Sequence, residues 1–190
     1  MGNDLMERNA IENHYRALKV IIGVVVLIAF GTTATYMAGK ASGTITGTVI
    51  AGWLTYSVVI IGLAAVMLRL FPTKPWLKWF MVLVLLMIVM SCRVISPVSE
   101  TIAMMYIVVI LSLLYFDVRL TLATCAVCLI ADWALMQYMP VMKPAANALA
   151  IRYFTFIFAA IAAGLGSMAT QRLMQLAYAR EKAAQEAGLK

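Results

Sequence analysis

Charged and chemically reactive side chains are scarce in this sequence. Only 12% of its 190 residues are Asp, Glu, Lys or Arg, whereas about a quarter of a typical soluble domain is charged. The motifs of serine hydrolases, zinc proteases, phosphate loops and dinucleotide-binding folds are all absent. The single histidine, His14, is too few for a bis-histidine haem within one chain. The sequence therefore predicts neither a soluble domain nor an enzyme, and it implies no cofactor.

Cysteine is also rare, and its positions argue against a disulfide framework. Cys92, Cys125 and Cys128 all lie inside apolar runs, and an odd number placed in this way is not the pattern of a disulfide-stabilised domain. Cys125 and Cys128 have C-x-x-C spacing, but a structural zinc site needs four ligands. We therefore predict buried thiols and no metal site.

What the sequence has in abundance is long apolar runs. Hydrophobic residues make up 64% of the chain, and they gather in runs of about twenty, the length with which a helix crosses a hydrocarbon core. Inside lipid every backbone amide needs an internal partner, so such runs form helices, and the alternating pattern of a membrane barrel is absent. The predicted fold is an all-α integral membrane bundle (19–169) of six spans: 19–39, 48–70, 77–95, 101–116, 120–139 and 148–169.

The connection between the fourth and fifth predicted spans is the shortest in the chain. Only Asp117, Val118 and Arg119 separate the two apolar runs, which predicts a tight antiparallel helical hairpin. Asp117 is predicted to cap the fifth span, because a carboxylate at this position accepts hydrogen bonds from the first free backbone N–H groups of a helix.

The basic residues predict the orientation of the bundle. The net charge is +7, and with a cytoplasmic N-terminus all but four of the 15 lysines and arginines lie on the cytoplasmic side, as the positive-inside rule requires. An even number of spans then returns the C-terminus to the cytoplasm. Residues 1–18 become a cytoplasmic polar leader, with a cleaved signal peptide over residues 1–41 as the competing interpretation. The positive charge is predicted to contact anionic membrane lipid and not nucleic acid.

Four aromatic residues are predicted at the membrane interfaces: Trp53, Trp76, Trp79 and Tyr138.

Charged residues within the spans all fall in the outer half of the predicted membrane. By helical rise, Arg93 and Asp132 lie about 22 Å and about 20 Å from the cytoplasmic edge. Arg152 lies near the outer end of the last span, and Glu100 begins the fourth. A charge that faces hydrocarbon is costly. We therefore expect these side chains to turn inward, with Asp132 paired with Arg152 or Arg93.

These charges predict a small-molecule site that opens outward. A cavity between helices with a few convergent polar groups is the usual form of such a site. Its predicted residues are Arg93, Glu100, Tyr106, Asp132, Trp133, Gln137, Arg152 and Tyr153. Two alternatives stay open. The ion pair can be structural, with the arginines reaching the outer head groups, or Asp132 can belong to a proton path.

A charged helical tail follows the last span. Residues 170–190 contain no helix breaker before Gly188 and are rich in Ala, Gln, Glu, Lys and Arg, so the helix is predicted to continue into the cytoplasm. Five residues repeat at the 3-4-3-4 spacing of a parallel coiled coil: Leu173, Leu176, Arg180, Ala183 and Ala187. The tail is predicted to pair with a second copy as a homodimer; the alternative is a solvated helix without a partner.

Two segments carry a resemblance to a known class of proteins. They are the hairpin Tyr115-Phe116-Asp117-Val118-Arg119 and the charged helix 179–187. Together with the six-span layout, they resemble the N-terminal sensor module of multi-span bacterial signalling receptors, which include membrane-embedded methyl-accepting chemotaxis proteins and related histidine kinases and diguanylate cyclases. The resemblance implies signal transduction at the bacterial inner membrane, in which the helix after the last span transmits ligand binding to a cytoplasmic output domain. Such a domain would follow Lys190.

Two other functions fit the same layout. A chain of 190 residues with six spans also resembles the substrate-binding subunit of vitamin importers of the energy-coupling type, although those subunits end shortly after the last span. The third possibility is a structural membrane protein without a ligand, in which the outer charges only fix the register of the helices.

Overall fold

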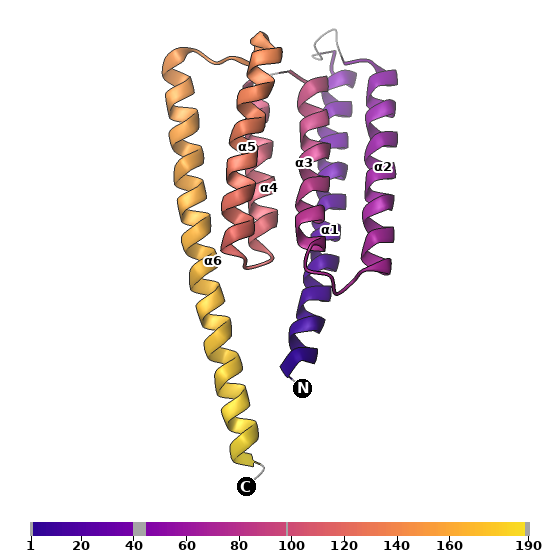
Figure 1. Ribbon diagram of the computed structural model, residues 1–190. Helices are drawn as coiled ribbons and strands as arrows, with labels where there is room; N and C mark the ends of the chain where they lie inside the picture. The colour runs from indigo at the N-terminus through magenta and orange to yellow at the C-terminus, as the bar shows by residue number, and fades with distance from the viewer. Residues whose placement is uncertain (1, 40–44, 98, 189–190) are drawn as a thin grey trace.

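The computed structural model describes residues 2–39, 45–97 and 99–188. In these residues the chain is mostly helical and contains no strand. Its α-helices are α1 (Gly2–Met37), α2 (Gly47–Leu70), α3 (Leu77–Ile95), α4 (Ala103–Leu113), α5 (Val118–Tyr138) and α6 (Ala146–Gly188). The helices run side by side, and the first turns of α1 and the last turns of α6 project from the same end (Figure 1). We call this end of the bundle the tail end.

Five of these helices are long and apolar enough to cross a membrane: α1, α2, α3, α5 and α6. The fold is therefore that of a multi-pass helical membrane protein. Helix α4 has 11 residues, about 17 Å at the α-helical rise, because the 3-10 turn Ser99–Ile102 precedes it and a turn follows Leu113. The structure thus supports five spans, and the sixth, 101–116, stays a prediction.

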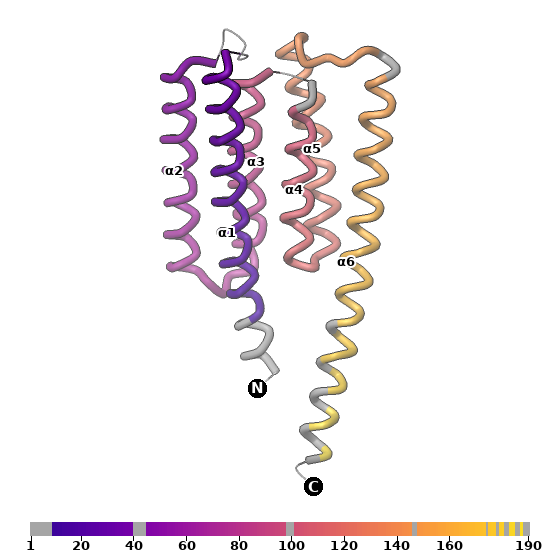
Figure 2. Tube along the Cα trace, turned by 180° about the vertical axis from the view of Figure 1, so that it is seen from behind, coloured from indigo at the N-terminus to yellow at the C-terminus, as the bar shows by residue number. Residues whose placement is uncertain are grey.

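Two helices extend well beyond their predicted spans. Helix α1 has 36 residues and includes nearly all of the polar leader 1–18, which is continuous with the first span and not set apart from it. Helix α6 has 43 residues, about 65 Å of unbroken helix. It runs the length of the bundle and continues past the tail end, as predicted from its composition (Figure 2).

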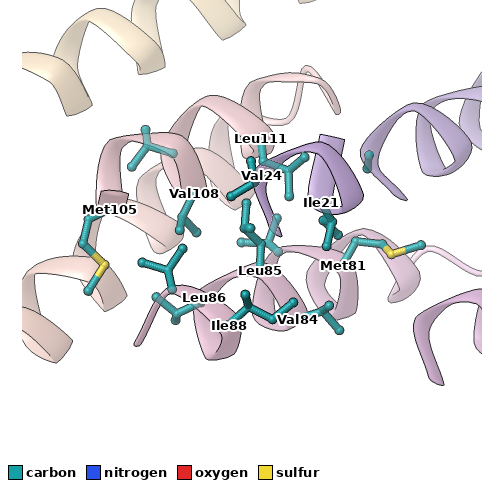
Figure 3. Close-up of a cluster of buried hydrophobic side chains, with 14 of the residues drawn as sticks. Ile21, Val24, Met81, Val84, Leu85, Leu86, Ile88, Met105, Val108 and Leu111 are labelled. Carbon is teal, nitrogen blue, oxygen red and sulfur yellow. The ribbon is translucent and has the colours of Figure 1, made fainter. Parts of the chain in front are cut away.

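The bundle is made of two groups of three helices. Helices α1, α2 and α3 pack on one another, as do α4, α5 and α6, and α3 joins the groups by packing against α4 and α5. Buried side chains of α1, α3 and α4 meet at this junction, with Leu85 at the centre of the cluster (Figure 3). Ile21, Leu85 and Leu111 are each 0% exposed. This packing fixes α3 as the helix that links the halves.

Trp53, one of the predicted interfacial aromatics, faces a neighbouring helix. It is buried, and its Nε1 donates a hydrogen bond to Ser91 Oγ of α3 at 3.0 Å. The indole N–H therefore finds its partner inside the bundle, and the interfacial depth of Trp53 stays a prediction. The other three predicted interfacial aromatics, Trp76, Trp79 and Tyr138, are exposed.

The α4–α5 hairpin is built as the sequence predicts. Asp117 Oδ1 accepts hydrogen bonds from the backbone N–H groups of Arg119 at 2.9 Å and Leu120 at 3.3 Å. Asp117 Oδ2 accepts a hydrogen bond from Lys78 Nζ of α3. Phe116 has a φ of 49°, a left-handed conformation that reverses the chain. The prediction of Asp117 as the cap of α5 is confirmed, and the cap also ties the hairpin to α3.

We expect Asp117→Ala to lower the free energy of unfolding by about 1–2 kcal/mol, because it removes the cap and the Lys78 partner together. Burial raises the pKa of Asp117, but hydrogen bonds from Lys78 and the backbone N–H groups outweigh burial and leave that pKa below its ordinary value. The contribution is therefore complete at neutral pH and is lost as pH falls through the lowered pKa. Thermal unfolding in detergent micelles, followed by tryptophan fluorescence, measures the loss. Asp117→Asn keeps the cap and should lose less; equal loss in both variants would contradict the capping role.

Candidate functional site

Three charged side chains from three helices meet inside the bundle, and we call them the charge cluster. Arg93 of α3, Asp132 of α5 and Arg152 of α6 are 0%, 1% and 9% exposed. Arg93 Nη2 donates a hydrogen bond to Asp132 Oδ1 at 2.6 Å, and Arg152 Nη1 lies 3.7 Å from Asp132 Oδ2. Asp132 thus pairs with both of the arginines that the sequence offered as alternatives.

The cluster lies toward the end of the bundle opposite the tail end. Arg93 is in the last turn of α3 and Arg152 is near the start of α6, and both of these segments lie at that end (Figure 1). If the tail end is cytoplasmic, the cluster occupies the outer half of the membrane, as the sequence predicts.

One arginine of the cluster keeps a spare hydrogen-bond donor. Within the described residues, Arg93 Nη1 is buried without a hydrogen-bond partner. The contact from Arg93 Nε to Thr101 Oγ1 measures 3.4 Å, longer than an ordinary hydrogen bond. Arg152 has additional contacts, among them a 3.4 Å hydrogen bond from Nη1 to Met136 Sδ. Because a buried donor without a partner is costly, Arg93 is the member of the cluster that can gain most from a further acceptor.

The remaining predicted site residues fall into three groups. Tyr106 of α4 and Tyr153 of α6 lie close enough to Asp132 and Arg152 to interact with them electrostatically. Trp133 and Gln137 of α5 are exposed, because successive residues of a helix point about 100° apart and these two face away from Asp132. The side chain of Glu100 lies outside the described residues. The structure therefore joins the cluster with two tyrosines and leaves Trp133 and Gln137 outside it.

An apolar groove of about 280 Å³ adjoins the cluster between α5 and α6. Its lining residues are Leu129, Ile130, Trp133, Tyr153 and Ile157. Tyr153 belongs both to the wall of this groove and to the surroundings of the cluster. Its hydroxyl is buried and has no hydrogen-bond partner in the part of the chain that is described. The walls of the groove are thus apolar, and the buried Tyr153 hydroxyl lies behind one of them, near the charges of the cluster.

A larger cavity, of about 380 Å³, lies at the tail end, and we call it the tail-end cavity. Its polar and aromatic lining comes from α1, α3, α6 and two connections: Asn9, Asn13, His14, Thr73, Lys74, Lys78, Tyr115, Phe116, Gln171 and Gln175. His14 Nδ1 and Tyr115 Oη are hydrogen-bonded at 3.1 Å. Sequence reasoning missed this cavity because its residues are far apart in the chain. The sequence does contain one indication of the cavity. Asn9 and Asn13 of α1, and Gln171 and Gln175 of α6, are each four residues apart, a spacing that places the two amides of each pair on one face of the helix.

The cysteines lie where the sequence predicts. All three are buried and free of disulfides. Among the side chains that the structure describes, no group of three or more His, Cys, Asp or Glu is placed to hold a metal ion.

Comparison with known proteins assigns no family to the chain. No protein-family model matches it, and no curated protein or solved structure matches it at a significant level. A function must therefore be inferred from a multi-pass helical fold, the charge cluster, the groove beside it and the tail-end cavity.

Proposed function

We propose that this chain is a transmembrane sensory module that binds a small ligand at the charge cluster and signals through α6. The observation that carries the proposal is that one unbroken helix holds both Arg152 and the tail that leaves the bundle. A helix of this length moves largely as a unit, so a change at Arg152 displaces or rotates the tail.

The ligand is a small anion with an apolar body. Arginine donors recognise carboxylate and phosphate groups, and Arg93 Nη1 and the Tyr153 hydroxyl are both buried without partners among the described residues. The adjoining groove between α5 and α6 supplies apolar walls for the rest of the molecule. An aliphatic or aromatic carboxylate fits both features.

The switch is the contact between Asp132 and Arg152. At 3.7 Å it is longer than the 2.6 Å contact between Asp132 and Arg93, so it is the easier of the two to exchange. A bound anion competes with Asp132 for arginine and favours a packing in which α6 is shifted. The ligand must bind that packing more tightly than the other, because only differential affinity changes the populations.

The tail passes the shift to a partner copy. Leu173 and Leu176 are 67% and 58% exposed in the single chain, and their heptad spacing suits a parallel coiled coil. We propose a homodimer in the bacterial inner membrane, with the leader and tail in the cytoplasm and the tail joined to an output domain.

Disulfide crosslinking in membrane vesicles tests this function. The variants Leu173→Cys and Leu176→Cys are oxidised with and without small carboxylates selected by a thermal-shift screen. We expect crosslinked dimers in both variants, and a ligand-dependent change of at least about twofold in the ratio of their yields, because a shifted helix exposes a different face to its partner.

The control for the crosslinking carries Arg93→Met, Asp132→Leu and Arg152→Met, which removes every charge of the cluster. It should form dimers but lose the ligand response. A ligand that binds the wild type without changing the crosslinks would instead favour the importer subunit. A folded wild type that responds to no carboxylate would favour a structural role.

A further inference from the structure

We propose that the tail-end cavity is a second binding site, for a phosphate group carried by an anionic lipid or by a soluble molecule. The site is independent of the proposed sensory function, because none of its lining residues belongs to the charge cluster or to the groove beside it.

The first support is a buried amide that faces the cavity. Asn13 is 7% exposed and lines the cavity. The side chain of Asn13 forms no hydrogen bond within the described residues. Its amide atoms nevertheless remain accessible from the cavity. An amide that is more than nine-tenths buried and lines a cavity is placed to bind what occupies that cavity, because an unsatisfied buried polar group is otherwise costly.

The second support is the sign of the charge. The described lining contains Lys74 and Lys78 and no carboxylate. Lys78 is paired with Asp117, whereas Lys74 forms no ion pair within the described residues. The remaining polar groups include the amides of Gln171 and Gln175, which are hydrogen-bond donors. The cavity is therefore positively charged and rich in donors.

A phosphate group meets these requirements. It offers several acceptor oxygens to donors that converge from different helices, and lysine binds it as a point charge. The volume of about 380 Å³ lies within the usual range of small-molecule sites, about 300–1,000 Å³. The cavity lies at the tail end, where the chain leaves the apolar part of the bundle, so a lipid head group and a soluble phosphate can both reach it.

A ligand in this site would fix the position of the part of α6 from which the tail leaves the bundle. Gln171 and Gln175 lie on α6 just where it leaves the bundle, and they face Asn9 and Asn13 of α1 across the cavity. Helices α1 and α6 otherwise pack on different neighbours. A bound phosphate bridges them, and it therefore stabilises the whole protein against unfolding.

Two binding measurements on the purified full chain in neutral detergent test the site. In the lipid arm, native mass spectrometry counts the phosphatidylglycerol molecules retained, with phosphatidylcholine for comparison. In the soluble arm, thermal unfolding is followed against sodium phosphate, with sodium chloride at equal ionic strength. We expect saturable binding in one arm, and about tenfold weaker binding in Lys74→Gln, the loss of one charge-assisted hydrogen bond.

Lys143→Gln is the matched control, because Lys143 is an exposed lysine in the connection between α5 and α6, at the opposite end of the bundle. It should bind like the wild type. Asn13→Leu, which replaces the buried amide by an apolar group, should also weaken binding. Binding in the lipid arm alone identifies a head-group site, and binding in the soluble arm identifies a free phosphate site. Equal affinities in Lys74→Gln and Lys143→Gln, or no saturable binding in either arm, would overturn the proposal.

Discussion

Asp132→Asn is expected to lower the free energy of unfolding by about 3–5 kcal/mol, the usual cost of removing one partner of a buried ion pair. Asparagine has almost the same shape as aspartate, so the loss is electrostatic and not a packing defect. Without the carboxylate, Arg93 and Arg152 are two buried positive charges that have lost their shared counter-charge. Denaturant titration in mixed micelles, followed by tryptophan fluorescence, measures the change.

The matched control for Asp132→Asn is the triple variant Arg93→Met, Asp132→Leu and Arg152→Met. It should recover most of the lost stability, because replacing a whole buried ion pair by apolar residues of similar size is often neutral or stabilising. The two experiments together separate stability from function, since the triple variant is expected to fold and lacks the anion site proposed at the charge cluster. If Asp132→Asn unfolds at the same denaturant concentration as the wild type, the ion pairs of Asp132 do not contribute to the stability of the protein.

Leu85→Ala is expected to lower the free energy of unfolding by about 2–5 kcal/mol. Leu85 is fully buried at the junction of α1, α3 and α4, so its truncation leaves a void between the two halves of the bundle. In a membrane, lipid tails are as apolar as leucine, and helix association depends on close packing. The void therefore costs the dispersion contacts that its walls lose.

Leu83→Ala is the internal control for Leu85→Ala. Leu83 lies two residues earlier on α3 and is 49% exposed, so lipid or detergent can fill the space that its side chain leaves. Its loss should stay below about 1 kcal/mol, in line with substitutions away from the core. Equal losses at the two positions, measured by the same denaturant titration, would contradict the placement of α3 between the helix groups.

Helix positions and local capping were predictable from the sequence because their causes are local. The ends of the third predicted span, 77–95, agree with α3, since proline and serine residues flank an apolar run. Asp117 caps α5 because its carboxylate reaches N–H groups two and three residues on. The tail continues as helix because it contains no breaker before Gly188. Each of these features depends on neighbours along the chain.

The buried partners were only partly predictable. The depth of Arg93, Asp132 and Arg152 in their spans follows from helical rise, and the cost of a charge in lipid requires that they pair. Whether Asp132 takes one arginine or both depends on how α3, α5 and α6 are placed around it, and the structure gives both. The burial of Trp53 was not predictable from the sequence, because its hydrogen bond to Ser91 requires α2 to lie against α3.

The sequence by itself determined an all-helical membrane protein, most of its helix ends, the cap of α5 and the continuous tail. Only the tertiary structure decided which side of each helix faces its neighbours, and hence the double pairing of Asp132, the burial of Trp53 and the existence of the tail-end cavity. The physical reason is that the outward faces of these helices meet lipid and not water. An apolar outer face is then as favourable as an apolar inner one, so the hydrophobic pattern that marks the buried side of a soluble helix is lost.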